Sequence, residues 1–157
     1  MSEYLTVTME GLYSEPETNL YLRGLLVCHN LIRLELRFYC FHHLDNVVEV
    51  LQNCPKLQFF SIKKWVVFQD NQVDLSRNWK EPNYVPECIS SHLRSCILDY
   101  NGMEDELRFA SYILQNALVL EVMKIIAANS NPLKNRDALE ELTFCPRISP
   151  HCKFSIC

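Results

Sequence analysis

The sequence predicts an α/β fold, a solenoid of stacked strand–helix repeats whose strands form one parallel sheet. Two observations support this prediction. The apolar pattern LxxLxL recurs four times along the chain, and apolar residues at helical spacing occupy two of the intervals between its copies. A period of about 20 to 29 residues accommodates one short strand and one returning helix. Stacking such units places the strands on one side and the helices on the other.

Composition argues against several classes of protein. The chain has 157 residues, of which 48% are hydrophobic and 22% charged, which suits one domain or a few repeats with a terminal module. Its net charge of −4 gives no sign of a nucleic-acid-binding surface, and its three glycines argue against a phosphate-binding loop. No apolar run approaches the roughly 20 residues of a membrane-spanning helix, and the N-terminus does not resemble a signal peptide. We therefore expect a cytoplasmic or nuclear protein that binds neither nucleic acid nor a membrane.

Each copy of the pattern predicts a short strand. The four copies span residues 31–36, 57–62, 93–98 and 120–125, and they start 26, 36 and 27 residues apart. A weaker copy, Tyr4–Met9, starts 27 residues before the first. The last two apolar positions of each copy are two residues apart, so both point to the same face of a sheet. This spacing is that of leucine-rich repeats, and we expect four or five parallel strands.

Helical spacing predicts the first return segment. It carries apolar residues at i, i+3, i+4 and i+7, namely Leu44, Val47, Val48 and Leu51. Pro55 follows closely and ends the helix, because proline cannot continue the backbone hydrogen-bond ladder. The chain is then expected to enter the next strand.

A second helix is expected after the third strand. The acidic run 104–106 suits a solvated first turn, where the helix dipole favours negative charge. The apolar stripe of this helix comprises Leu107, Ala110, Leu114, Ala117 and Leu118. A closing helix is expected near residues 137–143, and residues 153–157 are expected to form a last strand.

The interval between the second and third strands is longer than the others. It is rich in polar residues and contains Pro82 and Pro86, which predicts an inserted loop rather than a further repeat. The predicted organisation is therefore leucine-rich repeats over residues 1–64, an inserted loop over residues 65–78, and a terminal module over residues 79–157.

The cysteines do not indicate a metal site or a disulfide framework. The chain has eight, scattered singly with no CxxC pair, and without a secretory signal we expect free thiols in a reducing compartment. Zinc sites favour paired ligands, so no metal and no cofactor are expected. A Cys–His nucleophile pair stays possible in principle, because such partners meet in space rather than in sequence. No local signature accompanies any cysteine, and we predict that the protein is not an enzyme.

The second half of the chain carries an ordered set of motifs. They are VPECISSHL at 85–93, EDELRFASYILQNA at 104–117, LEVM at 120–123 and PRISPHC at 146–152. From Trp79 onward this set resembles the FBD module of plant F-box proteins. Residues 1–64 resemble the leucine-rich repeats that precede that module. The resemblance implies a leucine-rich-repeat solenoid closed by a C-terminal FBD module.

The resemblance also implies a role in the ubiquitin conjugation pathway. Such a protein is a substrate receptor of a cullin-RING ligase, in which an F-box docks on a Skp-type adaptor and the repeats select the protein target. No segment of the chain reads like an F-box, so a Skp-type adaptor is expected as a partner only if an F-box lies upstream. The favoured function is a protein–protein interaction module for target recognition. The alternative is a purely structural cap of the solenoid without binding activity of its own.

The uncovered side of the sheet is the predicted binding surface. Residues that flank the inward apolar positions face outward, and solenoids bind partners on the side without helices. The predicted partner-binding residues are Arg33, Glu35, Arg37, Phe59, Lys63, Asp99 and Lys124. Four cations against two anions favour a mildly acidic partner segment. Apolar contact is expected from exposed Phe59, Ile97, Val122 and Ile126. In the alternative, these are ordinary surface residues or are covered by the loop 65–86.

Overall fold

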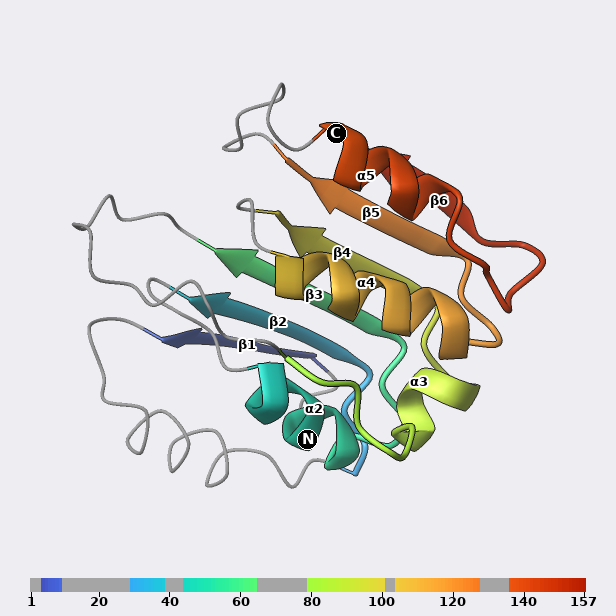
Figure 1. Ribbon diagram of the computed structural model, residues 1–157. Coiled ribbons are helices and arrows are strands. Elements are labelled where there is room, and N and C mark those ends of the chain that lie inside the picture. The colour runs from blue at the N-terminus through green and yellow to red at the C-terminus, as the bar shows by residue number, and fades with distance from the viewer. Residues whose placement is uncertain (1–3, 10–28, 39–43, 65–78, 101–103, 128–135) are drawn as a thin grey trace.

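The computed structural model describes residues 4–9, 29–38, 44–64, 79–100, 104–127 and 136–157 (Figure 1). In these ranges the chain has an α/β fold, in which strands and helices alternate from β2 onward. The strands are β1 (Tyr4–Met9), β2 (Arg33–Phe38), β3 (Phe59–Lys64), β4 (Ser95–Asp99), β5 (Val122–Ile126) and β6 (Lys153–Ile156). The helices are α2 (Leu44–Gln52), α3 (Glu87–Ser91), α4 (Glu104–Asn116) and α5 (Arg136–Thr143).

All six described strands belong to one open, parallel sheet. Its order is β1-β2-β3-β4-β5-β6, so each strand lies beside its neighbours in the chain. The α/β prediction with parallel strands is confirmed. The weaker copy of the pattern and the last expected strand both form, so the structure describes six strands where four or five were expected.

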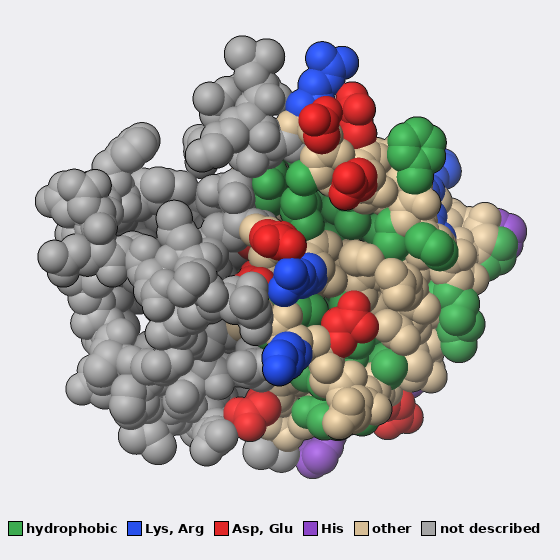
Figure 2. All heavy atoms as spheres, viewed as in Figure 1, with side chains coloured by type: hydrophobic (Ala, Val, Ile, Leu, Met, Phe, Trp, Pro, Cys, Tyr) green, Lys and Arg blue, Asp and Glu red, His purple; other side chains and the backbone are tan. Residues whose placement is uncertain are grey.

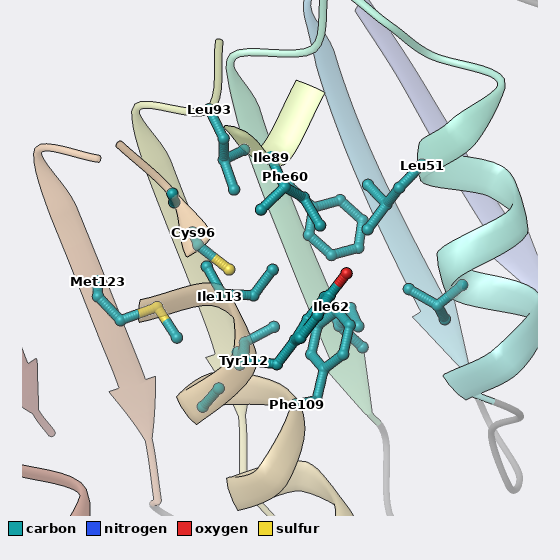
Figure 3. Packing of buried hydrophobic residues seen from close by; sticks show 14 of the residues in the cluster. Leu51, Phe60, Ile62, Ile89, Leu93, Cys96, Phe109, Tyr112, Ile113 and Met123 are labelled. Atoms are coloured by element: carbon teal, nitrogen blue, oxygen red, sulfur yellow. The ribbon is translucent and has the colours of Figure 1, made fainter. Parts of the chain in front are cut away.

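The helices lie on one face of the sheet and enclose the core (Figure 1). Alternate residues of each strand point into it, as the period of two requires, and among them Phe60, Ile62 and Cys96 are buried. Figure 3 shows Phe109 and Tyr112 of α4 beside these sheet side chains. The apolar stripe of α4 therefore packs onto the centre of the sheet.

The predicted stripe of α4 is one residue too long. Leu118 is 51% exposed, whereas Leu114 and Ala117 are buried. The helix ends at Asn116, where the Asn116 side chain donates to the Tyr112 carbonyl. Leu118 lies on the turn that follows, outside the helical periodicity, so the prediction for this residue was wrong.

The sequence led us to expect a solvated first turn of α4, but two of its three acidic side chains are buried. Asp105 is only 7% exposed and Glu106 is also buried, while Glu104 is exposed. The Asp105 carboxylate accepts a hydrogen bond from the Trp79 backbone N–H at 3.0 Å. The Trp79 ring packs edge-on against Phe109 of α4. The backbone N–H of Trp79 is also buried there, and a buried N–H needs an acceptor.

Helix α3 was not predicted. Its short span contains buried Cys88 and Ile89, and the Cys88 thiol donates to the Leu51 carbonyl at 3.3 Å. Residues 65–78, the predicted inserted loop, lie outside the described residues. The strands on either side of this segment pair directly, since β3 is parallel to β4. The predicted closing helix forms as α5.

Candidate functional site

The face of the sheet opposite the helices is the candidate site. Strand residues that alternate with the buried ones point to this face, and no described helix covers it (Figure 1). We call it the open face. It comprises Tyr4, Thr6, Arg33, Glu35, Arg37, Phe59, Ser61, Lys63, Ser95, Ile97, Asp99, Val122, Lys124, Ile126, Lys153 and Ser155.

The parallel register arranges these side chains in rows across the strands. The first row contains, in order, Tyr4, Arg33, Phe59, Ser95, Val122 and Lys153. The second row contains Thr6, Glu35, Ser61, Ile97, Lys124 and Ser155. Neighbouring strands lie about 4.8 Å apart, so adjacent members of a row are in contact range.

Arg33 stacks between two aromatic rings of the first row. Its guanidinium carbon lies 4.3 Å from the centroid of the Phe59 ring and 5.8 Å from that of Tyr4. A guanidinium over an aromatic face is attracted by the ring quadrupole, and the planar group stacks well. The two rings therefore restrict the guanidinium of Arg33.

Glu35 lies between two cations of the open face. Its carboxylate oxygens are 2.9 Å from Lys63 Nζ and 2.9 Å from Arg37 Nη2, and Arg37 Nε also donates to it at 3.1 Å. Burial alone would raise the pKa of Glu35. The hydrogen bonds and positive charges of Lys63 and Arg37 outweigh burial, and the pKa is lowered from its ordinary value. Glu35 is therefore an anion that two neighbours share.

The remaining cations of the open face are differently placed. Lys124 lies on β5, beside Ile97 in the second row, and Lys153 lies on the edge strand β6. Among the described residues, neither Arg33 nor Lys124 forms an ion pair with a carboxylate, in contrast to Arg37 and Lys63. Positive charge is thus available at Arg33 and Lys124, one at each side of the sheet centre, and at Lys153 on the edge strand β6.

The structure groups the predicted site residues unevenly. On β2 and β3 it brings five of them together, namely Arg33, Glu35, Arg37, Phe59 and Lys63. The other two lie on the following strands, Asp99 on β4 and Lys124 on β5.

The expectation of exposed apolar residues was wrong for three of four positions. Phe59, Ile97 and Ile126 are half-buried, and among the four only Val122 is exposed. Tyr4 was missed as a site residue, although the weak repeat at Tyr4–Met9 was visible in the sequence.

Other kinds of site find less support. Within the described residues no group of three or more His, Cys, Asp or Glu side chains is arranged to hold a metal ion. Among the described helices, none has the length and apolar character needed to cross a membrane. On the helix-covered side, acidic and basic side chains are interspersed (Figure 2). The open face, in contrast, carries five cations and two anions.

Comparison with known proteins gives the following similarities. The FBD family matches residues 81–125, which include α3, β4 and α4. A probable FBD-associated F-box protein of Arabidopsis thaliana is 30% identical over 130 residues, which cover 82% of this chain and 30% of that protein. An F-box/FBD/LRR-repeat protein of the same plant is 32% identical over 143 residues, 82% of this chain and 30% of that protein.

A further Arabidopsis thaliana protein, an FBD-associated F-box protein, is 39% identical over 97 residues, 59% of this chain and 22% of that protein. The chain thus spans about 30% or less of the length of these relatives. No solved structure matches it. The FBD family match covers α3 and α4 and the strand between them, all of which contribute residues to the buried core.

Proposed function

Because the chain is an FBD-domain relative of the FBD-associated F-box proteins, we propose that it recognises protein targets as part of an F-box-type substrate receptor for ubiquitin ligation. In this proposal the open face binds the target. A Skp-type adaptor is a partner only where an F-box is joined to the chain. The role proposed is binding, without catalysis by the chain itself.

The architecture proposed for this role is a leucine-rich-repeat solenoid. Each strand pairs only with its neighbours in sequence, and the helices return on one face, which is how such repeats stack. Leucine-rich repeats also appear in the names of two relatives. We propose that residues 1–64 are the repeats, that residues 65–78 are an insertion, and that residues 79–157 form the FBD module that closes the stack.

The observation that supports binding most directly is the open face. It joins a stacked Arg33 with half-buried aromatic and aliphatic side chains, and no described helix covers it. Interface cores are enriched in arginine and aromatic residues, which bury large areas at low entropic cost. On the other side the helices turn most of their apolar residues into the core, while Tyr84, Leu118 and Phe144, which lie outside the sheet, are exposed.

The test compares charge and ring variants on the two sides of the molecule. A target is first isolated by affinity capture with the full chain and then purified. Phe59→Ala and Lys124→Glu should each weaken binding of that purified target by roughly tenfold or more, a loss expected of central interface residues. Circular dichroism and thermal unfolding establish that each variant folds.

Lys80→Glu is the matched control for the charge reversal. Lys80 is exposed and follows Trp79, whose ring packs on α4, so it belongs to the helix-covered side. Its variant should bind as the unaltered chain does. Loss of binding in this control, with both open-face variants unaffected, would put the site on the other side. If no purified protein binds the chain, the structural cap without binding activity becomes the better explanation.

A further inference from the structure

We infer that the open face recognises an internal acidic segment of the target, with one Asp or Glu carboxylate at Arg33 and a second at Lys124. This inference rests on the proposed function and specifies the chemistry of the partner. It depends on which cations of the open face are already paired, and on the spacing of the others.

The guanidinium of Arg33 is preorganised to bind a carboxylate. The rings of Phe59 and Tyr4 restrict the guanidinium, at 4.3 and 5.8 Å from its central carbon. Because the side chain is already restricted, less conformational entropy is lost when a partner binds. A planar guanidinium donates two parallel hydrogen bonds to a carboxylate, which makes this pair stronger and more directional than one with lysine.

Arg37 and Lys63 are less suited to this role. Both already contact Glu35 at 2.9 Å, so a partner carboxylate at either would compete with an existing ion pair. Glu35 would also repel it. Among the four cations predicted from the sequence, the attraction that the open face offers a partner is therefore concentrated at Arg33 and Lys124. The fifth cation of the open face, Lys153, lies on the edge strand β6, outside the span between these two.

The register fixes the spacing of these two cations. Arg33 is on β2 and Lys124 on β5, three strands away, which corresponds to about 14 Å across the sheet. Lys124 shares a row with Glu35, two residues beyond Arg33, which adds about 7 Å along the strands. The backbone positions are thus about 16 Å apart, the span of about five residues in an extended chain.

The surface between the two cations determines what lies between the two acids. The intervening open-face positions are half-buried and carry small or apolar side chains, namely Phe59, Ser61, Ser95 and Ile97. A charged side chain placed there would lose hydration without gaining a partner. The partner segment is therefore extended, with two acidic residues four or five positions apart and small or apolar residues between them. A free chain terminus would supply only one of the two carboxylates.

The test selects peptides on the intact protein. A library of capped peptides with randomised positions is selected on the full chain, with neither terminus carrying a charge. Peptides with two acidic residues four or five positions apart should be enriched. The affinity of an enriched peptide should fall roughly tenfold for each Glu→Gln or Asp→Asn change, the loss expected for a hydrogen bond to a charged group, and should fall further as salt is added.

Variants of the protein assign each acid to its cation. In Arg33→Gln, neutralising one of the two peptide acids should no longer lower the affinity. In Lys124→Gln, neutralising the other acid should no longer lower it. A double-mutant cycle measures both couplings. Arg33→Lys should also weaken binding, because it keeps the charge but loses the stacked, two-pronged donor. Lys80→Gln, which removes one positive charge on the helix-covered side, is the control and should leave affinity unchanged.

The outcomes separate this inference from the proposed function. Enrichment of peptides without acids, no enrichment at all, or equal effects of Arg33→Gln and Lys80→Gln would each overturn the acidic-segment inference. The proposed function would survive these results if a purified target still lost binding on Phe59→Ala. The proposed function would fail if the open-face variants left target binding intact, or if no purified protein bound the chain.

Discussion

At the scale of single residues, Asp105 illustrates how a charged side chain becomes part of the core. It lies in the first turn of α4, where the helix dipole favours an anion, and its carboxylate accepts the Trp79 backbone N–H at 3.0 Å. Arg108, one turn later, approaches the same carboxylate at 3.9 Å. Asp105 thus connects the segment before α3 to the helix that covers the centre of the sheet.

Asp105→Ala should destabilise the protein by about 1–3 kcal/mol, because it leaves a buried backbone N–H without its acceptor. The free energy of unfolding is measured by urea titration. Glu104→Ala, at the exposed neighbouring position, removes the same charge from the same helix turn and should change stability by no more than about 0.5 kcal/mol. Equal losses in the two variants would mean that the dipole, and not the Trp79 contact, gives Asp105 its importance.

At the scale of elements, the loop between α5 and β6 connects the last strand to the rest of the fold. Ser149 is only 6% exposed, and its hydroxyl donates to the Leu120 carbonyl at 2.6 Å. The Ile148 backbone N–H donates to the Leu114 carbonyl at the end of α4. Both contacts hold the loop against the turn between α4 and β5, and so position β6 for pairing.

Ser149→Ala should loosen β6 selectively, since the Leu120 carbonyl loses its buried donor. Hydrogen exchange should become faster at the amides of Lys153 and Cys157, which donate to β5 and the residue before it. Exchange in β2 and β3 should not change. Ser155→Ala, an exposed position on β6 itself, is the control. Equal acceleration in β6 and β2 would show global destabilisation instead of local loosening.

Elements differed in how far sequence could predict them. Helix α2 and helix α4 were predictable because each repeats its apolar residues at helical spacing over two or more turns. Helix α3 was not, because its five residues are too few to display a period. Its stability comes from packing, with Ile89 fully buried and Cys88 bonded to α2. Burial also raises the pKa of the Cys88 thiol to about 12, so it stays protonated at neutral pH.

The sequence predicted which residues lie on the open face, but not which of its charged side chains contact one another. Strand alternation correctly placed Arg33, Glu35 and Lys63 on one face of the sheet. Charge counting treated every cation on that face as equally available to a partner. Only the register reveals that Glu35 is shared by two of them, and that Arg33 stacks on Phe59 from the adjacent strand.

At the scale of the whole molecule, each layer of the core depends on the next. Phe60 and Ile62 of β3 are buried under side chains of α4, including Tyr112 (Figure 3). Repeat proteins gain stability from such contacts between neighbours, and about three repeats are needed before a stack is stable. The part of the chain before residue 65 therefore leaves an uncovered apolar layer when it stands alone.

Residues 1–64 alone should lack a cooperative unfolding transition and be cleaved rapidly by protease. The full chain, measured under the same conditions, should unfold cooperatively and resist cleavage. The comparison uses thermal unfolding followed by circular dichroism, together with a protease time course. A fragment as resistant and as cooperative as the full chain would show that the first strands need no cover from α4.

The sequential strand order also affects how the molecule responds to force. Strands β1 and β6 form opposite edges of the described sheet, and every ladder between them joins neighbours in the chain. Tension applied between these edges acts across the strands, so it loads one ladder at a time instead of shearing all of them together. The strands should then separate one after another from an edge of the sheet, each at a low force. A force applied to the chain outside an edge strand would therefore meet a series of small unfolding barriers, one per strand, rather than a single large barrier.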